Sequence, residues 1–188
     1  MEIRLAALGI QSDSIVDGEG IRSVIWTQGC IHNCPGCHNP ETHSFKTGHL
    51  IDIEDILEQI NELKGQDGIT FSGGDPMEQA SACAKIAEHC QSLGLNVWCY
   101  TGYTYEELLE KSLVFTNIRS FLENIDVLVD GKFKEDEKSY DAVFRGSKNQ
   151  RLIDVKKSLE TNKVVIIEKY SNSEKNNSKG RKNRYMYV

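Results

Sequence analysis

Three cysteines fall within eight residues of the segment GCIHNCPGCHNPET, which runs from Gly29 to Thr42. Cys30, Cys34 and Cys37 have the spacing C-x3-C-x2-C, and the glycines and prolines around them prevent regular secondary structure. Structural zinc sites and ordinary iron–sulfur clusters both use four ligands. A loop with three cysteines therefore either finds a fourth ligand elsewhere or leaves one metal position open.

Several chemistries fit such a loop. His32, His38 or His43 would complete a Cys3His zinc site, which would make the loop a structural staple. Cys34 and Cys37 would instead suit a thiol redox pair. A 4Fe–4S cube held by three thiolates would leave its fourth iron free for the amino and carboxylate groups of an amino acid. S-adenosylmethionine offers that chelate together with a sulfonium that one electron can cleave.

Length, composition and charge narrow the class of protein. The 188 residues favour a single domain, and 39% hydrophobic residues suffice for an ordinary core. The net charge of −6 does not favour a nucleic-acid partner. We find no run of about 18 apolar residues that would predict a membrane span, and the charged N-terminal segment is unlike a secretory signal. We therefore expect a cytoplasmic protein with reduced cysteines.

Strand and helix patterns alternate along the chain. Apolar runs predict strands over 20–28, 68–74, 95–102, 125–131 and 164–168. Helical spacing predicts helices over 52–64, 75–93, 104–111 and 117–123. This order indicates an α/β fold on a parallel sheet. Because the units are too few for an eight-fold barrel, we expect a partial, open β/α barrel of mainly parallel strands, with the cysteine loop after its first strand.

Groups that can carry chemistry follow four of the predicted strands. They are the cysteine loop, Gly73–Gly74, Thr101–Gly102 and Asp130–Gly131. Function gathers at the carboxyl ends of the strands in parallel sheets, so we expect these four ends to face one cleft. The remaining cysteines, Cys83, Cys90 and Cys99, fall within a predicted helix and a predicted strand. We interpret them as small buried hydrophobes.

The end of the chain differs in composition from the rest. Residues 169–188 contain six Lys or Arg and one Glu among many Asn and Ser. Such a composition predicts a flexible basic tail, which leaves residues 1–168 as the folded domain. The tail is either a solvated segment or a docking segment for an acidic partner surface.

Five segments make the chain resemble the radical S-adenosylmethionine superfamily. They are DGEGIRSVIWTQGC (17–30), CPGCHNPET (34–42), TFSGGDP (70–76), IDVLVDGKF (125–133) and FRGSKNQRLID (144–154). The spacing C-x3-C-x2-C after a first strand is the signature of that superfamily. More narrowly, most of residues 10–155 resembles the activating enzymes of anaerobic ribonucleoside-triphosphate reductase.

The resemblance implies a specific oxidoreductase chemistry. Cys30, Cys34 and Cys37 would hold one 4Fe–4S cluster per chain, with S-adenosylmethionine bound at the open iron. One electron from the reduced cluster would break a carbon–sulfur bond, giving methionine and a 5′-deoxyadenosyl radical. That radical would take a hydrogen atom from a glycine Cα of the reductase, leaving a glycyl radical. A low-potential donor such as flavodoxin or ferredoxin would supply the electron.

Two alternatives stay open at this point. Activators of other glycyl-radical enzymes, such as pyruvate formate-lyase, would share the chemistry and differ in the partner. A zinc-stapled interaction module without catalysis would share only the cysteine loop. Purified protein separates the two classes by colour, because an iron–sulfur protein is brown and a zinc protein is colourless.

The resemblance also assigns cofactor-binding residues. They are Gly36, Cys37, His38, Gly73, Gly74 and Asp75. Many superfamily members carry an aromatic residue where this chain has Gly36, so His38 is the candidate ring here. Asp75 is either a helix cap or a cofactor contact. Arg22 is either a structural salt-bridge former or a cleft contact, and Asp130 either faces the cleft or caps a turn. Arg145, Asn149 and Arg151 of the RGSKNQR stretch could shape either the site or the partner surface.

Overall fold

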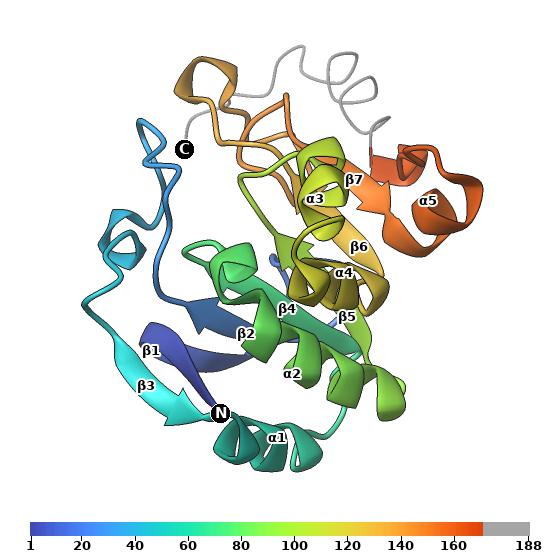
Figure 1. The fold of residues 1–188 in the computed structure, drawn as a ribbon. Coiled ribbons are helices and arrows are strands. Elements are labelled where there is room, and N and C mark those ends of the chain that lie inside the picture. Colours follow the sequence, from blue (N-terminus) through green and yellow to red (C-terminus); the bar gives the residue numbers. More distant parts are fainter. Residues whose placement is uncertain (171–188) are drawn as a thin grey trace, which may run out of the picture.

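An open sheet of seven strands organises residues 1–170, which are the residues described by the computed structural model (Figure 1). The strands are β1 (Glu2–Ser14), β2 (Arg22–Thr27), β3 (His49–Asp52), β4 (Gly68–Gly73), β5 (Asn96–Tyr100), β6 (Val127–Asp130) and β7 (Arg151–Asp154). Their order is β3-β1-β2-β4-β5-β6-β7. Neighbours among β2, β4, β5 and β6 run parallel, whereas β1, β3 and β7 pair antiparallel. The α/β class is confirmed, and parallel pairing is confined to the centre.

Residues 1–170 form five α-helices, of which four connect strands and the fifth follows the last strand. They are α1 (Ile53–Asn61), α2 (Ala80–Ser92), α3 (Tyr105–Ser112), α4 (Thr116–Glu123) and α5 (Val155–Thr161). Asp52 caps α1, and Thr104 forms a capping box with Glu107 at the start of α3. The predicted helix 75–93 begins instead as a 3-10 turn, Pro76–Gln79, before α2.

The strands that sequence patterns missed, β1, β3 and β7, lie outside the parallel centre of the sheet. β3 and β7 are four residues long, and β1 changes register twice along its pairing with β2, so none shows a regular alternation. The predicted strand 164–168 is wrong. This segment runs beside β7 through the bonds Asp154 N–H to Val165 O and Ile167 N–H to Leu152 O, which give only an isolated bridge to Ile153.

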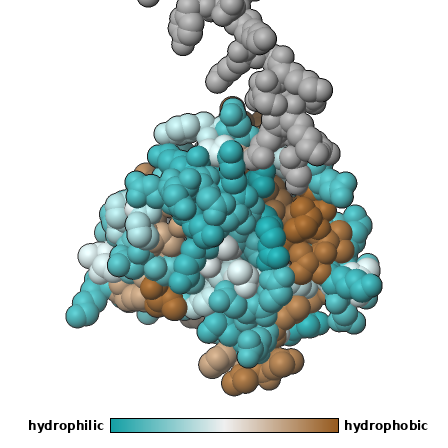
Figure 2. Space-filling view, turned by 90° about the horizontal axis from the view of Figure 1, so that it is seen from above, coloured by the Kyte–Doolittle hydropathy of each residue, from teal (hydrophilic) through white to brown (hydrophobic). Residues whose placement is uncertain are grey.

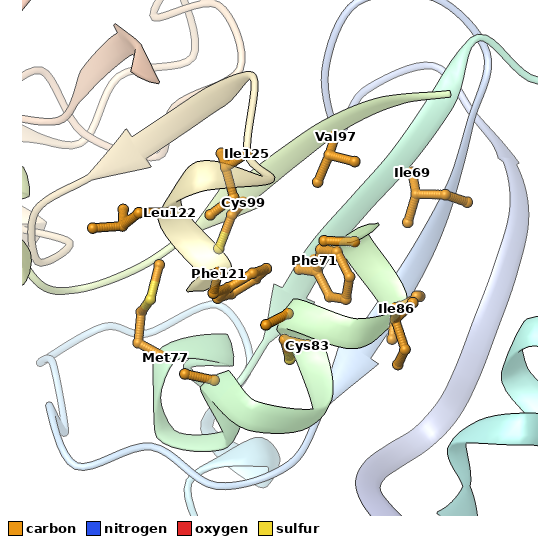
Figure 3. Packing of buried hydrophobic residues seen from close by; sticks show 14 of the residues in the cluster. Ile69, Phe71, Met77, Cys83, Ile86, Val97, Cys99, Phe121, Leu122 and Ile125 are labelled. Atoms are coloured by element: carbon orange, nitrogen blue, oxygen red, sulfur yellow. The ribbon is translucent and has the colours of Figure 1, made fainter. Parts of the chain in front are cut away.

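The main core lies between the sheet and the helices. Phe71 from β4 meets Phe121 from α4 edge to face, with ring centroids 5.2 Å apart (Figure 3). Three cysteines, Cys83, Cys90 and Cys99, are 0% exposed in this core. We call them the core cysteines, and their interpretation as small buried hydrophobes is confirmed.

Loops rather than helices cover the other face of the sheet. Arg22 is buried there and donates hydrogen bonds to Thr70 Oγ1 and to the carbonyls of Ile69 and Asn96. Burial lowers the pKa of the Arg22 guanidinium to about 10. Arg22 therefore has a structural role, in which it joins strand ends through neutral acceptors instead of a salt bridge.

The domain extends slightly beyond the predicted boundary at residue 168. Lys169 and Tyr170 belong to a 3-10 turn, Glu168–Tyr170, and both contact Glu19. Tyr170 is only 8% exposed and packs edge to face against Trp98 and Phe144. The rest of the predicted tail, residues 171–188, lies outside the described residues.

The surface seen from above is mostly hydrophilic, with hydrophobic side chains in separate groups, the largest toward the right of the view (Figure 2). Among residues 1–170, the helices are too short and too polar to cross a membrane.

Candidate active site

A cavity of about 420 Å³ opens where the parallel strands end. Its wall contains Cys30, Cys34 and Cys37, which we call the loop cysteines, and residues that follow β4, β5 and β6. The prediction that four strand ends face one cleft is confirmed, with one exception. Asp130 is buried away from the cavity, where its carboxylate accepts hydrogen bonds from Tyr105 N–H and Arg151.

The backbone closes the cysteine loop without help from the sulfurs. Gly29 N–H donates to Thr42 O at 2.8 Å, and Cys30 N–H donates to His43 O at 3.1 Å. The Gln28 carboxamide adds bonds to carbonyls further along the loop, at Glu41 and Ser44. The loop therefore leaves β2 and returns to it as a closed unit.

Backbone N–H groups lie near all three sulfurs. Asn39 N–H donates to Cys37 Sγ at 3.4 Å, those of His32 and Asn33 lower the pKa of Cys30, and that of Phe133 lowers the pKa of Cys34. Such donors stabilise negative charge on sulfur, which is the state of a cysteine that binds iron. The arrangement suits thiolate ligands better than packed neutral thiols.

Burial is the main influence on two of these thiols in the metal-free chain. It raises the pKa of Cys30 to about 11, with a smaller contribution from the nearby Asp75 carboxylate. Burial also raises the pKa of Cys34 above its usual value. Both groups are therefore protonated at neutral pH, and metal binding must release their protons.

The ligand groups are spread along the cavity wall. Within residues 1–170, no three side chains of His, Cys, Asp or Glu gather closely enough to hold a single metal ion. A zinc staple needs four such ligands around one point, whereas each cysteine of an iron–sulfur cube binds a different iron.

Gly73 and Gly74 bring the end of β4 against the start of the cysteine loop. A Cβ on Gly73 would lie 2.5 Å from Thr27 O, and one on Gly74 would lie 2.4 Å from Gly29 O. Gly74 N–H donates to Thr27 O at 2.8 Å. Both glycines also line the cavity, so the absence of a side chain permits the close approach of two backbone segments here.

Asp75 links the cysteine loop to the end of β5. Its carboxylate, 1% exposed, accepts hydrogen bonds from Thr101 Oγ1, Gly102 N–H and Met77 N–H and lies 2.7 Å from His32 Nε2. Asp75 therefore caps the turn before α2, and it does not line the cavity. Sequence reasoning considered His32 only as a zinc ligand and missed this pairing, for which spacing gives no signal.

Gly36 and His38 lie on different sides of the cysteine loop. Gly36 has φ of +69° and faces Glu135, so it forms the turn between two cysteines and does not line the cavity. His38 does line it, with its ring 4.8 Å from that of Phe133. The segment between β6 and β7 supplies a further wall residue, Arg145. The sequence had singled out the RGSKNQR stretch that contains it but did not predict which of its side chains line the cavity.

The cavity with its three cysteines defines the class of protein, and a family comparison agrees. Residues 16–153 match the family described as "4Fe-4S single cluster domain". The match includes all three loop cysteines, and the chain belongs to this family. Of the chemistries that fit the loop, an iron–sulfur cluster is therefore the one that holds.

Three curated relatives carry the same name, "anaerobic ribonucleoside-triphosphate reductase-activating protein". That of Haemophilus influenzae is 36% identical over 148 residues, which cover 72% of this chain and 89% of the relative. That of Salmonella typhi is 35% identical over 144 residues, covering 72% and 90%. That of Escherichia coli is 34% identical over 146 residues, also covering 72% and 90%. The chain belongs to the family of these activating proteins.

Proposed function

We propose that this protein is an enzyme that activates an anaerobic ribonucleoside-triphosphate reductase. It generates a glycyl radical on the reductase through reductive cleavage of S-adenosylmethionine at a 4Fe–4S cluster. The observation that carries this proposal is the position of the three loop cysteines, which line one cavity at the ends of the parallel strands. The names and identities of the curated relatives support the choice of partner.

The donor set fits a cluster with one open iron. The chain has six cysteines, and the three core cysteines, two on α2 and one on β5, are 0% exposed. None of the core cysteines can reach the cavity without unfolding, so protein thiolates account for only three corners of a cube. The cavity of about 420 Å³ is within the range of small-molecule sites.

When bound, the cluster supplies one electron at low potential, and S-adenosylmethionine supplies the carbon–sulfur bond that the electron breaks. Cys30, Cys34 and Cys37 would hold the cluster, and nearby backbone N–H groups would stabilise their charge. Gly73 and Gly74 line the cavity without side chains, so they would let backbone groups approach the methionine part of the cofactor.

The other assigned residues act around that centre. His38 offers a ring on the cavity wall, next to Cys37. Gly36 forms the turn that sets the spacing of the last two cysteines, and Asp75 positions His32 and Gly102. We assign electron delivery to a flavodoxin or ferredoxin in the cytoplasm, where the reductase would also be found.

Electron paramagnetic resonance tests the proposal. Anaerobically reconstituted protein is mixed with a reductant, S-adenosylmethionine and the reductase, and a glycyl radical signal is expected on the reductase. Pyruvate formate-lyase in place of the reductase is the matched control and should stay silent. If the cluster is reduced but no radical forms on the reductase, the proposed partner is refuted. A radical signal on the lyase would instead identify the protein as an activator of the pyruvate formate-lyase type.

A further inference from the structure

Arg145 brings a positive charge to the cavity wall, and no carboxylate of residues 1–170 forms a salt bridge with it. Its Nη1 donates to Gln150 O at 3.2 Å and its Nη2 to Tyr170 O at 3.4 Å. Its Nε is buried and has no hydrogen-bond partner within the described residues. Nearby Arg151, by contrast, pairs with the carboxylates of Glu106 and Asp130. Burying a cation with an unpaired hydrogen-bond donor lowers the stability of the fold unless an anion binds to it.

The backbone around Arg145 is held in an unfavourable conformation. Phe144 has φ of +57°, in the left-handed region that bulky side chains avoid. The Gln150 side chain fixes this turn, since it accepts from Gly146 N–H and Ser147 N–H and donates to Gly131 O. Such strain persists where the surroundings enforce it, often at binding sites. Arg145 is therefore held at a defined place on the wall.

This turn lies directly against the cysteine loop. A Cβ on Gly146 would lie 3.0 Å from the Phe133 ring and 3.2 Å from His38 Cε1. His38 follows Cys37 in the chain. Both residues line the same cavity as Phe133 and Gly146. Arg145 and the three loop cysteines thus line one and the same cavity.

We propose that Arg145 binds the carboxylate of S-adenosylmethionine, an inference that rests on the proposed function. Arg145 is the one Lys or Arg on the cavity wall formed by the described residues. Its planar guanidinium matches a carboxylate with two parallel hydrogen bonds. A carboxylate has two oxygens with several lone pairs, so it can meet an iron and a guanidinium at once.

Equilibrium binding to the reconstituted holoprotein tests this assignment without recourse to activity. The variants are Arg145→Met and Arg145→Lys, with Arg119→Met as control, because Arg119 pairs with Glu123 on the exposed side of α4. The two probes are S-adenosylmethionine and decarboxylated S-adenosylmethionine, which keeps the sulfonium and the amine. Iron content and thermal unfolding check that each variant is intact.

For Arg145→Met, we expect affinity for S-adenosylmethionine to fall about 10- to 100-fold, as for loss of a charged hydrogen bond. Affinity for the decarboxylated probe should change less than about twofold, since the lost contact is absent from that ligand. Arg145→Lys should lose less for the intact cofactor, because it keeps the charge without the planar fork. If Arg145→Met loses its cluster, the same two-probe comparison on Arg145→Lys decides.

Three outcomes would overturn the assignment. Equal weakening of both probes means a structural role for Arg145. Unchanged binding of S-adenosylmethionine with weaker binding of the reductase means that the guanidinium serves a carboxylate of the protein substrate. Wild-type holoprotein that binds neither probe refutes the proposed function itself, which separates that failure from a failure of the Arg145 assignment.

Discussion

The loop cysteines and the core cysteines are the same residue type in opposite surroundings. The loop cysteines are partly exposed, line a cavity and receive backbone N–H donors. The core cysteines are 0% exposed and pack among aliphatic and aromatic side chains (Figure 3). The core cysteines lie in a helix and a strand, and regular structure turns their side chains into the core. The loop cysteines lie in an irregular segment, which leaves their sulfurs at the cavity and available as ligands.

The largest expected effect separates the two sets by substitution. Cys34→Ala should lose the cluster and with it the cleavage of S-adenosylmethionine, because only two protein ligands remain. Cys83→Ala should keep both and lose about 1–2 kcal/mol of unfolding free energy, as for a small cavity. Iron and sulfide analysis, visible absorption and denaturant unfolding measure these effects. A brown Cys34→Ala variant beside a colourless Cys83→Ala variant would reverse the ligand assignment.

The next effect compares two helix caps, one at the site and one remote from it. Asp75→Ala leaves His32, Thr101 and Gly102 without their shared acceptor, and it should lower the free energy of unfolding by about 3 kcal/mol. Asp52→Ala removes an exposed cap of α1 and should cost about 1 kcal/mol. Urea unfolding of the metal-free proteins measures both. Equal costs would mean that the buried network adds nothing to the cap.

A third comparison concerns two glycines. Gly74→Ala places a Cβ 2.4 Å from Gly29 O, so it should push the cysteine loop away from β4. We expect a loss of about 2 kcal/mol together with a lower iron content. Gly94→Ala, at a position with φ of +76° and open space around it, should cost about 1 kcal/mol and leave the iron content unchanged. Normal iron loading of Gly74→Ala would show that the loop tolerates the displacement.

The smallest effect is a pH dependence in the unsubstituted, metal-free protein. Because the pKa of Cys30 is raised to about 11, its thiolate fraction is small at neutral pH and grows as the pH rises. Alkylation of Cys30 should therefore accelerate about tenfold for each pH unit between 7 and 10. The core cysteines should stay unmodified over that range, since burial excludes the reagent and raises the pKa of each. Mass spectrometry follows each site, and a Cys30 rate that levels off below pH 9 would contradict the raised pKa.

Local signals in the sequence were enough to predict the central strands, the helices α1 to α4 and the cysteine loop, whereas α5 was missed. Strand β4 ends at two glycines and the loop is interrupted by prolines, and both features act within a few residues. The antiparallel strands β1, β3 and β7 were not predictable in this way, because pairing with distant segments defines them.

The finer structure of the site depended on contacts across the chain. His32 meets Asp75 across 43 positions, and Arg145 takes its place from the turn that Gln150 holds. Neither relation follows from periodicity or spacing. The same limit explains why Tyr170 was assigned to the tail. The basic, Asn- and Ser-rich composition of residues 169–188 predicted a flexible segment, whereas the Tyr170 ring packs on Trp98.

The closed backbone of the cysteine loop has a consequence for damage by air. Oxygen destroys an exposed iron centre, but the bonds from Gly29 and Cys30 to Thr42 and His43 do not involve sulfur. The damaged chain would therefore retain the shape of its loop, and fresh iron and sulfide would restore it in place without refolding. Repair after exposure then becomes a matter of metal supply rather than of new protein synthesis.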